Sequence, residues 1–157
     1  MAITTKIQVK TYLKEYIIGR FCDTNDQAVR FPDRTDIYHT IWDLLEKRPK
    51  NVSIDSGNLE IILPNRDLGK SPTVYNYLGV RSQQIIERHI SAMMWAELHS
   101  LLTDNKHMLG INYIDSIHHF MRKYCIDSIT EDAFLKNYYR WRENLRKKSK
   151  KSFRARV

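Results

Sequence analysis

Four apolar residues near the C-terminus constrain the fold of this chain most tightly. They are spaced four, three and four residues apart, and they are Phe134, Tyr138, Trp141 and Leu145. An α-helix turns by about 100° per residue, so these side chains share one narrow stripe, which indicates a helix with one face packed on a core. Thr130 is a favourable N-cap, and Glu131 and Asp132 follow it. Because the helix dipole favours negative charge in a first turn, the helix should begin at about Glu131.

The other faces of this helix carry positive charge, which continues to the end of the chain. Residues 136–157 hold ten Lys and Arg residues and a single acid, Glu143. The other 135 residues hold 16 basic and 17 acidic residues, so the net charge of +8 belongs to the C-terminal segment. Such a concentration favours a polyanionic partner, nucleic acid above all, over a solvated helix end. The candidate nucleic-acid-binding residues are Lys136, Tyr139, Arg140, Arg142, Arg146, Lys147, Lys148, Lys150, Lys151, Arg154 and Arg156.

A shorter helix is predicted just before the basic one. The residues of its expected buried face are spaced three, four and three apart, and they are Ile114, Ile117, Met121 and Tyr124. This helix should start near Ile111. Residues 125–129 connect the two helices without a glycine, so Asp127 or Ser128 is expected to adopt any unusual backbone angle. A short helix, a turn and a longer basic helix form the outline of a helix-turn-helix unit. Residues 111–148 resemble the small helix-turn-helix DNA-binding proteins of phages and mobile elements.

The resemblance implies a DNA-binding protein whose second helix enters a groove. The first turn of that helix, where the motif reads bases, is acidic here, so phosphate contacts are expected rather than base-specific ones. DNA is favoured over RNA. Single-stranded nucleic acid and RNA remain alternative ligands, because exposed rings such as Tyr139 and Phe153 can stack on unpaired bases. Tyr138 and Trp141 are interpreted as core residues.

The rest of the chain predicts an α+β, predominantly helical fold. Strands are expected at 3–10 and 59–63. Helices are expected at 11–18, stopped by Gly19, between a cap at Asp33 or Thr35 and Pro49, which lies just past the helix end, and from 82 to about 102, with a polar break at 104–107. The turn-rich stretch 64–72 is the candidate boundary between two lobes. The predicted organisation is a small N-terminal α/β lobe (1–70), a helical lobe with the helix-turn-helix-like unit (71–148; unit 111–148) and a flexible basic arm (149–157).

Several classes of function are disfavoured by what the sequence lacks. Two isolated cysteines predict neither a disulfide framework nor a zinc site, and the six histidines form no metal-binding motif. No phosphate-binding loop or nucleophile elbow is present, so no catalytic residue, cofactor or metal is expected. Without an apolar signal core or a run of about 20 apolar residues, the expectation is a cytoplasmic protein without a membrane partner, and the sequence leaves a homo-oligomer open. The competing hypothesis is a structural or assembly component of a phage particle or nucleoprotein complex.

Overall fold

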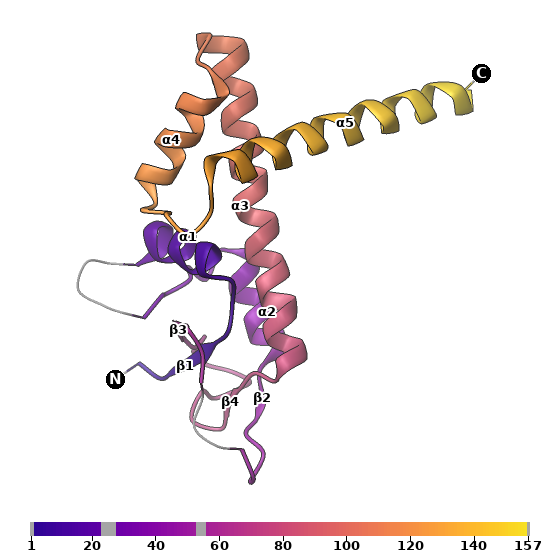
Figure 1. Ribbon diagram of the computed structural model, residues 1–157. Helices are drawn as coiled ribbons and strands as arrows, with labels where there is room; N and C mark the ends of the chain where they lie inside the picture. Colours follow the sequence, from indigo (N-terminus) through magenta and orange to yellow (C-terminus); the bar gives the residue numbers. More distant parts are fainter. Residues whose placement is uncertain (1, 23–27, 53–55, 157) are drawn as a thin grey trace. The chain divides into compact units, whose positions relative to one another are not determined.

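The computed structural model describes residues 2–22, 28–52 and 56–156. The chain divides into two compact units, Met1–Trp95 and Ala96–Val157. Within the described residues, five helices and four strands follow one another (Figure 1): β1 (Thr4–Ile7), α1 (Thr11–Phe21), α2 (Asp36–Leu44), β2 (Glu46–Lys47), β3 (Leu59–Ile62), β4 (Tyr75–Tyr77), α3 (Val80–Leu109), α4 (Tyr113–Lys123) and α5 (Glu131–Arg156). The fold is α+β and predominantly helical, as the sequence predicts.

The first unit is built around an antiparallel pair of strands, β1 and β3. Lys6 lies opposite Glu60 on one face of the pair, while Ile7, Leu59 and Ile61 are buried on the other. This alternation of exposed and buried side chains is the period-two pattern from which the first strand was predicted, whereas the second was predicted from its apolar run between turn residues and Pro64. A second, smaller antiparallel pair joins β2 to β4. Neither β2 nor β4 is predicted from the sequence, because two- and three-residue strands are too short to show a period.

Gly57 and Asn58, directly before β3, hold β1 in place. A Cβ atom on residue 57 would lie 2.4 Å from the carbonyl oxygen of Ile7, so a larger residue cannot fit unless the backbone shifts. The Asn58 side chain accepts a hydrogen bond from the Val9 N–H at 3.0 Å and donates one to the Val9 carbonyl at 2.7 Å. The register of the sheet therefore depends on these two residues as well as on the ladder.

Three helices supply the apolar side chains of the first unit. The buried residues come from α1 (Leu13, Tyr16, Ile17), α2 (Ile37, Ile41) and the first half of α3 (Ile86, Ile90, Met94). Gly19 does not end α1 as predicted, since the helix continues to Phe21. The Phe21 ring packs edge-to-face against Phe31 at 5.2 Å, and this tertiary contact offsets the low helix propensity of an interior glycine.

The turn-rich stretch 64–72, predicted as the boundary between two lobes, contacts the C-terminal end of α2. The Lys70 ammonium donates hydrogen bonds to the carbonyl oxygens of Trp42, Asp43 and Leu45 at 2.9–3.0 Å, at the C-terminal end of α2. The Arg66 guanidinium lies 4.7 Å from the Trp42 ring centroid. Because cations at a helix C-terminus satisfy its last carbonyls, this turn-rich stretch is tied to α2 inside the first unit. The division between the units falls instead within α3, after Trp95.

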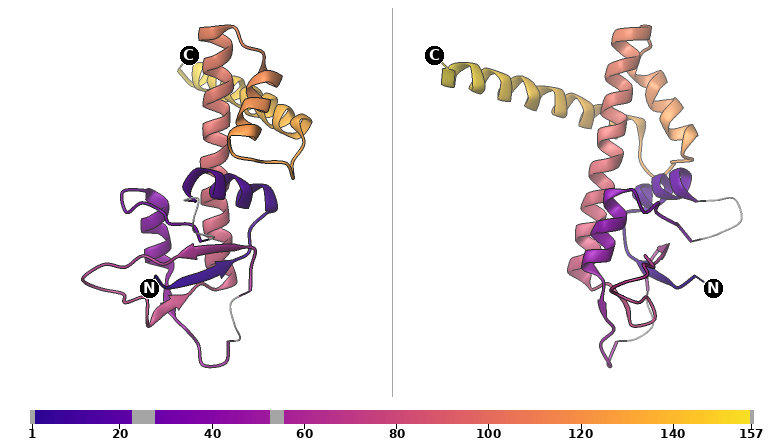
Figure 2. Two further views of the ribbon diagram at one scale, coloured as in Figure 1. Left: turned by 90° about the vertical axis from the view of Figure 1, so that its left-hand side faces the viewer. Right: turned by 180° about the vertical axis from the view of Figure 1, so that it is seen from behind.

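The second unit packs the end of α3 together with α4 and α5 (Figure 2). Its most buried side chains are Leu98, Leu102, Ile117, Phe120, Phe134 and Tyr138. The predicted polar break at 104–107 is helical, and α3 ends at Leu109 before Gly110, whose φ is +66°. The side-chain amide of Asn105 donates to the Ser116 hydroxyl at 3.0 Å, so a polar residue of the supposed break is used in packing.

The buried face of α4 differs from the predicted one. Tyr113, Ile117, Phe120 and Tyr124 are spaced four, three and four apart, and the last three are buried. Ile114, which the prediction placed in the core, is 37% exposed. The two stripes share Ile117 and Tyr124 and differ in direction by about 50°, so the choice between them depends on which residues face α5.

The connection between α4 and α5 is ordered by backbone hydrogen bonds. The Ile126 N–H donates to the Met121 carbonyl at 2.8 Å and the Cys125 N–H to the Arg122 carbonyl at 3.3 Å. This is a Schellman motif, which requires a left-handed residue between the helix and the chain that follows. Cys125 is that residue, with a φ of +53°, so the expectation that Asp127 or Ser128 would adopt the unusual angle is wrong.

Candidate nucleic-acid interface

The first three turns of α5 are anchored in the second unit. Phe134 is fully buried and Tyr138 is 1% exposed. The Tyr138 hydroxyl lies 2.9 Å from the Thr103 hydroxyl of α3, and burial raises the pKa of the Tyr138 phenol. The Trp141 ring stacks on His99 with a centroid distance of 4.5 Å. The start of the basic helix is therefore held by an aromatic core, as the stripe predicts for Phe134, Tyr138 and Trp141.

The stripe ends at Trp141. Leu145, predicted to face inward, is 45% exposed, and every described residue from Glu143 onward is exposed. We call Glu143–Arg156 the outer half of α5. Residues 149–156, predicted to be a flexible arm, belong to this helix, while Val157 lies outside the described residues. Lys, Arg and Ala are strong helix formers, so the helix continues beyond its last tertiary contact.

Arg142 and Tyr139 are held by Tyr113, the first residue of α4. The Arg142 guanidinium donates to the Tyr113 hydroxyl at 3.0 Å and lies 5.8 Å from the Tyr138 ring centroid. The Tyr139 ring meets Tyr113 edge-to-face at 6.1 Å, yet Tyr139 remains 49% exposed. Arg142 is therefore used within the second unit, whereas Tyr139 keeps an open surface. Tyr113 was missed by the sequence analysis, and its spacing of four from Ile117 was the signal that could have revealed it.

Two further predicted residues lie beside acids of their own helix. The Lys136 ammonium is 2.9 Å from Asp132, and the Arg146 guanidinium is 3.8 Å from Glu143. Both pairs are more than half exposed, and exposed pairs of this kind contribute under about 1 kcal/mol. They leave the positive charge of Lys136 largely balanced at close range. The positive charge that no neighbouring acid balances therefore lies nearer the C-terminal end of α5 than the sequence pattern alone predicts.

Most of the predicted basic residues, including Lys136, lie along the exposed surface of α5. At about 100° per residue, five predicted residues fall within about 60° of one another, opposite the core stripe; they are Lys136, Arg140, Lys147, Lys151 and Arg154. From Arg146 to Arg156 there are seven basic residues and no acid. Over a helix rise of about 15 Å this is one positive charge per about 2 Å. Duplex DNA carries one negative charge per about 1.7 Å of its axis, so the two charge densities are nearly matched.

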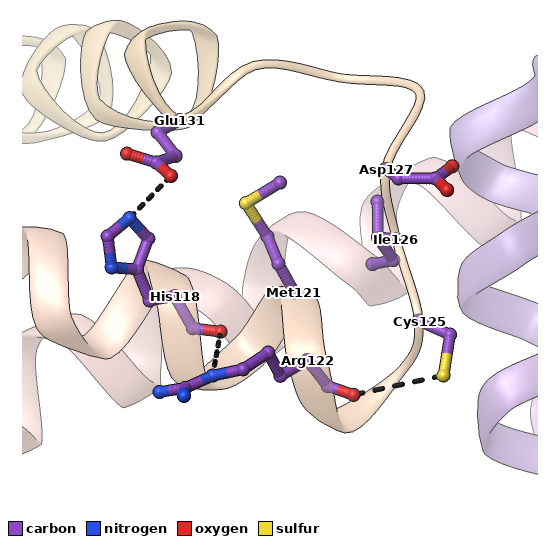
Figure 3. A pocket seen from close by; sticks show the side chains of 7 residues that line it. All are labelled: His118, Met121, Arg122, Cys125, Ile126, Asp127 and Glu131. Atoms are coloured by element: carbon purple, nitrogen blue, oxygen red, sulfur yellow. Dashed lines mark hydrogen bonds and ion pairs between the residues drawn. The ribbon is translucent and has the colours of Figure 1, made fainter.

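The start of α5 borders a pocket of about 550 Å³. It is lined by His118, Met121, Arg122, Cys125, Ile126, Asp127 and Glu131. Figure 3 shows the His118 ring pointing to the Glu131 carboxylate, with which it is paired. Together with the pair between Asp132 and Lys136, this contact engages both acids of the first turn. The first turn of α5 therefore offers a phosphate little attraction, and the candidate interface is the outer half of the helix.

Other kinds of site are not found in the described part of the chain. Across residues 2–22, 28–52 and 56–156, no three His, Cys, Asp or Glu side chains are arranged to hold a metal ion. None of the helices in these ranges has both the length and the apolar character needed to cross a membrane. Comparisons with known proteins find no family model, no curated protein and no solved structure that matches the chain.

His99 lies between α3 and α5 and is expected to make the stability of the second unit depend on pH. It is 8% exposed, and its Nε2 lies 2.8 Å from the Asn137 side-chain oxygen. Burial lowers the pKa of His99, and the hydrogen bond that the His99 ring donates to the Asn137 side-chain oxygen offsets part of this effect. The unfolded chain therefore binds a proton at about pH 6.5 while folded His99 is still neutral. We expect stability to be constant above that pH and to decrease as the pH falls toward the folded pKa.

This expectation is checked by chemical denaturation between pH 8 and pH 5. In the His99→Gln variant the decrease between pH 6.5 and pH 5 should be smaller, because one linked proton is removed. The variant also loses the stacking on Trp141, so the slope against pH is compared, and not the absolute stability. A slope identical to that of the unmodified chain would mean that His99 protonates equally in both states.

Proposed function

We propose that this protein binds nucleic acid, DNA in preference to RNA, through phosphate contacts made by the outer half of α5. The observation that carries the proposal is the run of seven exposed basic residues without an acid between Arg146 and Arg156. Its spacing of about one charge per 2 Å of helix is close to that of the DNA polyanion. No catalytic step is part of this proposal.

The repulsion within the outer half of α5 supports a polyanionic ligand. Lys147 lies one turn from both Lys150 and Lys151, and Lys150 and Lys151 lie one turn from Arg154. Each like-charge pair at these spacings opposes the helix by about 0.2–0.5 kcal/mol. Binding to a row of phosphates is therefore favoured in two ways. The phosphates offset the repulsion between the basic side chains, and they release their condensed counterions.

The shape of the outer half of α5 favours DNA over RNA. Its described residues are exposed on every side, and a helix of about 10–12 Å diameter fits the major groove of B-DNA, which is about 12 Å wide. The major groove of A-form RNA is deep and narrow and does not admit a helix in this way. Because the first turn of α5 has both acids engaged, binding should depend little on base sequence. Such binding also suits an assembly component of a nucleoprotein complex.

A salt-titrated binding assay tests the proposal. The full chain is titrated with mixed-sequence DNA and RNA duplexes of about 20 base pairs, and log K is plotted against log salt concentration. Lys147→Gln and Lys151→Gln should each reduce the slope by about 1 and weaken binding to all DNA sequences alike. The matched controls are Lys6→Gln and Lys50→Gln, each of which removes one charge from an exposed position of the first unit.

Two results would contradict the proposal. One is a slope that the α5 variants leave unchanged, since the phosphate contacts would then lie elsewhere. The other is an equal loss in the control variants, because that would assign binding to net charge and not to α5. A strong preference for one DNA sequence would show that the protein reads bases, which argues against an assembly component.

A further inference from the structure

Two aromatic side chains on α5 are exposed beside basic residues. Phe153 is 72% exposed in the outer half of the helix, and Tyr139 is 49% exposed near its anchored start. The edge-to-face contact with Tyr113 limits the freedom of the Tyr139 ring, about half of which stays exposed. Neither ring is placed where the fold gains from burying it.

Both rings lie on the same flank of α5. At about 100° per residue, Tyr139, Arg146, Lys150 and Phe153 fall within about 60° of one another, and the rings are about 21 Å apart along the axis. This flank is rotated by about 100° from the face that carries Lys147, Lys151 and Arg154. We call it the aromatic flank: an exposed ring at each end and two basic residues between them.

We propose that the aromatic flank binds an unpaired nucleic-acid strand, with bases stacked on Tyr139 and Phe153 and phosphates at Arg146 and Lys150. This inference rests on the proposed function and names a ligand that the phosphate contacts alone do not select. Aromatic stacking on bases is indifferent to sequence, because every base has a flat face. It requires the bases to be exposed, so a continuous duplex cannot use these rings.

The composition of the outer half of α5 favours this ligand over a lipid surface. A helix that lies in a membrane interface needs a continuous apolar face opposite a basic one. Among its described residues the exposed large apolar side chains are Leu145 and Phe153, and they are separated by about 80° around the axis. Phe153 instead has Lys150 one turn away on the same flank, and this mixture of ring and cation matches a strand of bases and phosphates.

The test compares a 20-nucleotide deoxythymidine strand with a 20-base-pair duplex at one salt concentration. Tyr139→Leu and Phe153→Leu keep apolar side chains of similar bulk and remove the rings. Each should weaken binding to the single strand by about fivefold or more, since stacking is worth at least about 1 kcal/mol per base, and each should change duplex binding less than about twofold. Tyr139→Phe keeps a ring and should bind the single strand like the unmodified chain. Leu145→Ala is the control for an exposed apolar residue outside the aromatic flank.

Several outcomes overturn the inference. Unchanged single-strand binding in both leucine variants shows that the rings do not stack on bases, and an equal loss on single strand and duplex shows that unpaired bases are not recognised. Loss of binding to phosphatidylserine vesicles without a loss on the single strand would assign the flank to a membrane. The proposed function is judged separately by Lys147→Gln and Lys151→Gln, which should still weaken duplex binding if only the aromatic inference fails.

Discussion

Replacing Phe134 by alanine should lower the free energy of unfolding of the second unit by about 3–5 kcal/mol. Phe134 is fully buried at the first turns of α5, and its ring meets Phe120 of α4 edge-to-face at 6.0 Å. The substitution therefore removes a large apolar side chain and leaves a cavity between the two helices. Amide hydrogen exchange of residues 131–142, read by mass spectrometry alongside thermal unfolding, measures the effect on this unit.

Leu145→Ala is the control on the same helical stripe. Its side chain is 45% exposed, so the expected loss is under about 1 kcal/mol. The pair of variants separates the anchored part of α5 from its outer half. Equal destabilisation by the two substitutions would mean that Leu145 is packed inside the second unit, as the sequence pattern alone predicts.

Periodicity in the sequence predicted where α5 begins but not where its packing ends. Thr130 caps the helix through a hydrogen bond from the Ala133 N–H at 3.2 Å. This capping signal is local, because the two residues are three positions apart in the sequence. The exposure of Leu145 depends on how far the other helices of the second unit extend alongside α5, which no local pattern records. Gly19 and the polar residues 104–107 were misread for the same reason, since tertiary contacts keep both stretches helical.

The candidate interface was predictable as a region and not residue by residue. The excess of Lys and Arg after residue 136 is visible in the sequence. The ion pairs of Lys136 and Arg146 are also local, because their partners lie within one turn. Arg142 could not be assigned in this way, since its partner Tyr113 is 29 positions away and on another helix. The sequence pattern therefore groups residues that the structure uses in different ways, since Arg142 is bound within the second unit and Lys136 and Arg146 lie beside acids.

Reversing three charges on the exposed face of α5 should weaken duplex DNA binding on the order of 10³-fold at about 50 mM salt. Lys147→Glu, Lys151→Glu and Arg154→Glu remove three candidate phosphate contacts. Each contact is worth about 0.9 log unit per tenfold change in salt, and 50 mM lies about 1.3 decades below 1 M, so three contacts amount to about 3.5 log units. Repulsion between the new carboxylates and phosphate adds to the loss. Fluorescence anisotropy with a labelled duplex at several salt concentrations gives both affinity and slope.

The same triple variant should keep the fold, because all three side chains are exposed and opposite the core stripe. Its helix content should stay at the original level or rise, since the like-charge pairs that involve these three positions at one-turn spacing fall from five to three and the others become attractive. Lys6→Glu, Lys10→Glu and Arg34→Glu change the net charge equally from exposed positions of the first unit. If this control loses as much affinity as the α5 variant, the long-range field of the whole chain drives binding. A large loss confined to the α5 variant, with helix content and unfolding unchanged, assigns the phosphate contacts to the outer half of α5.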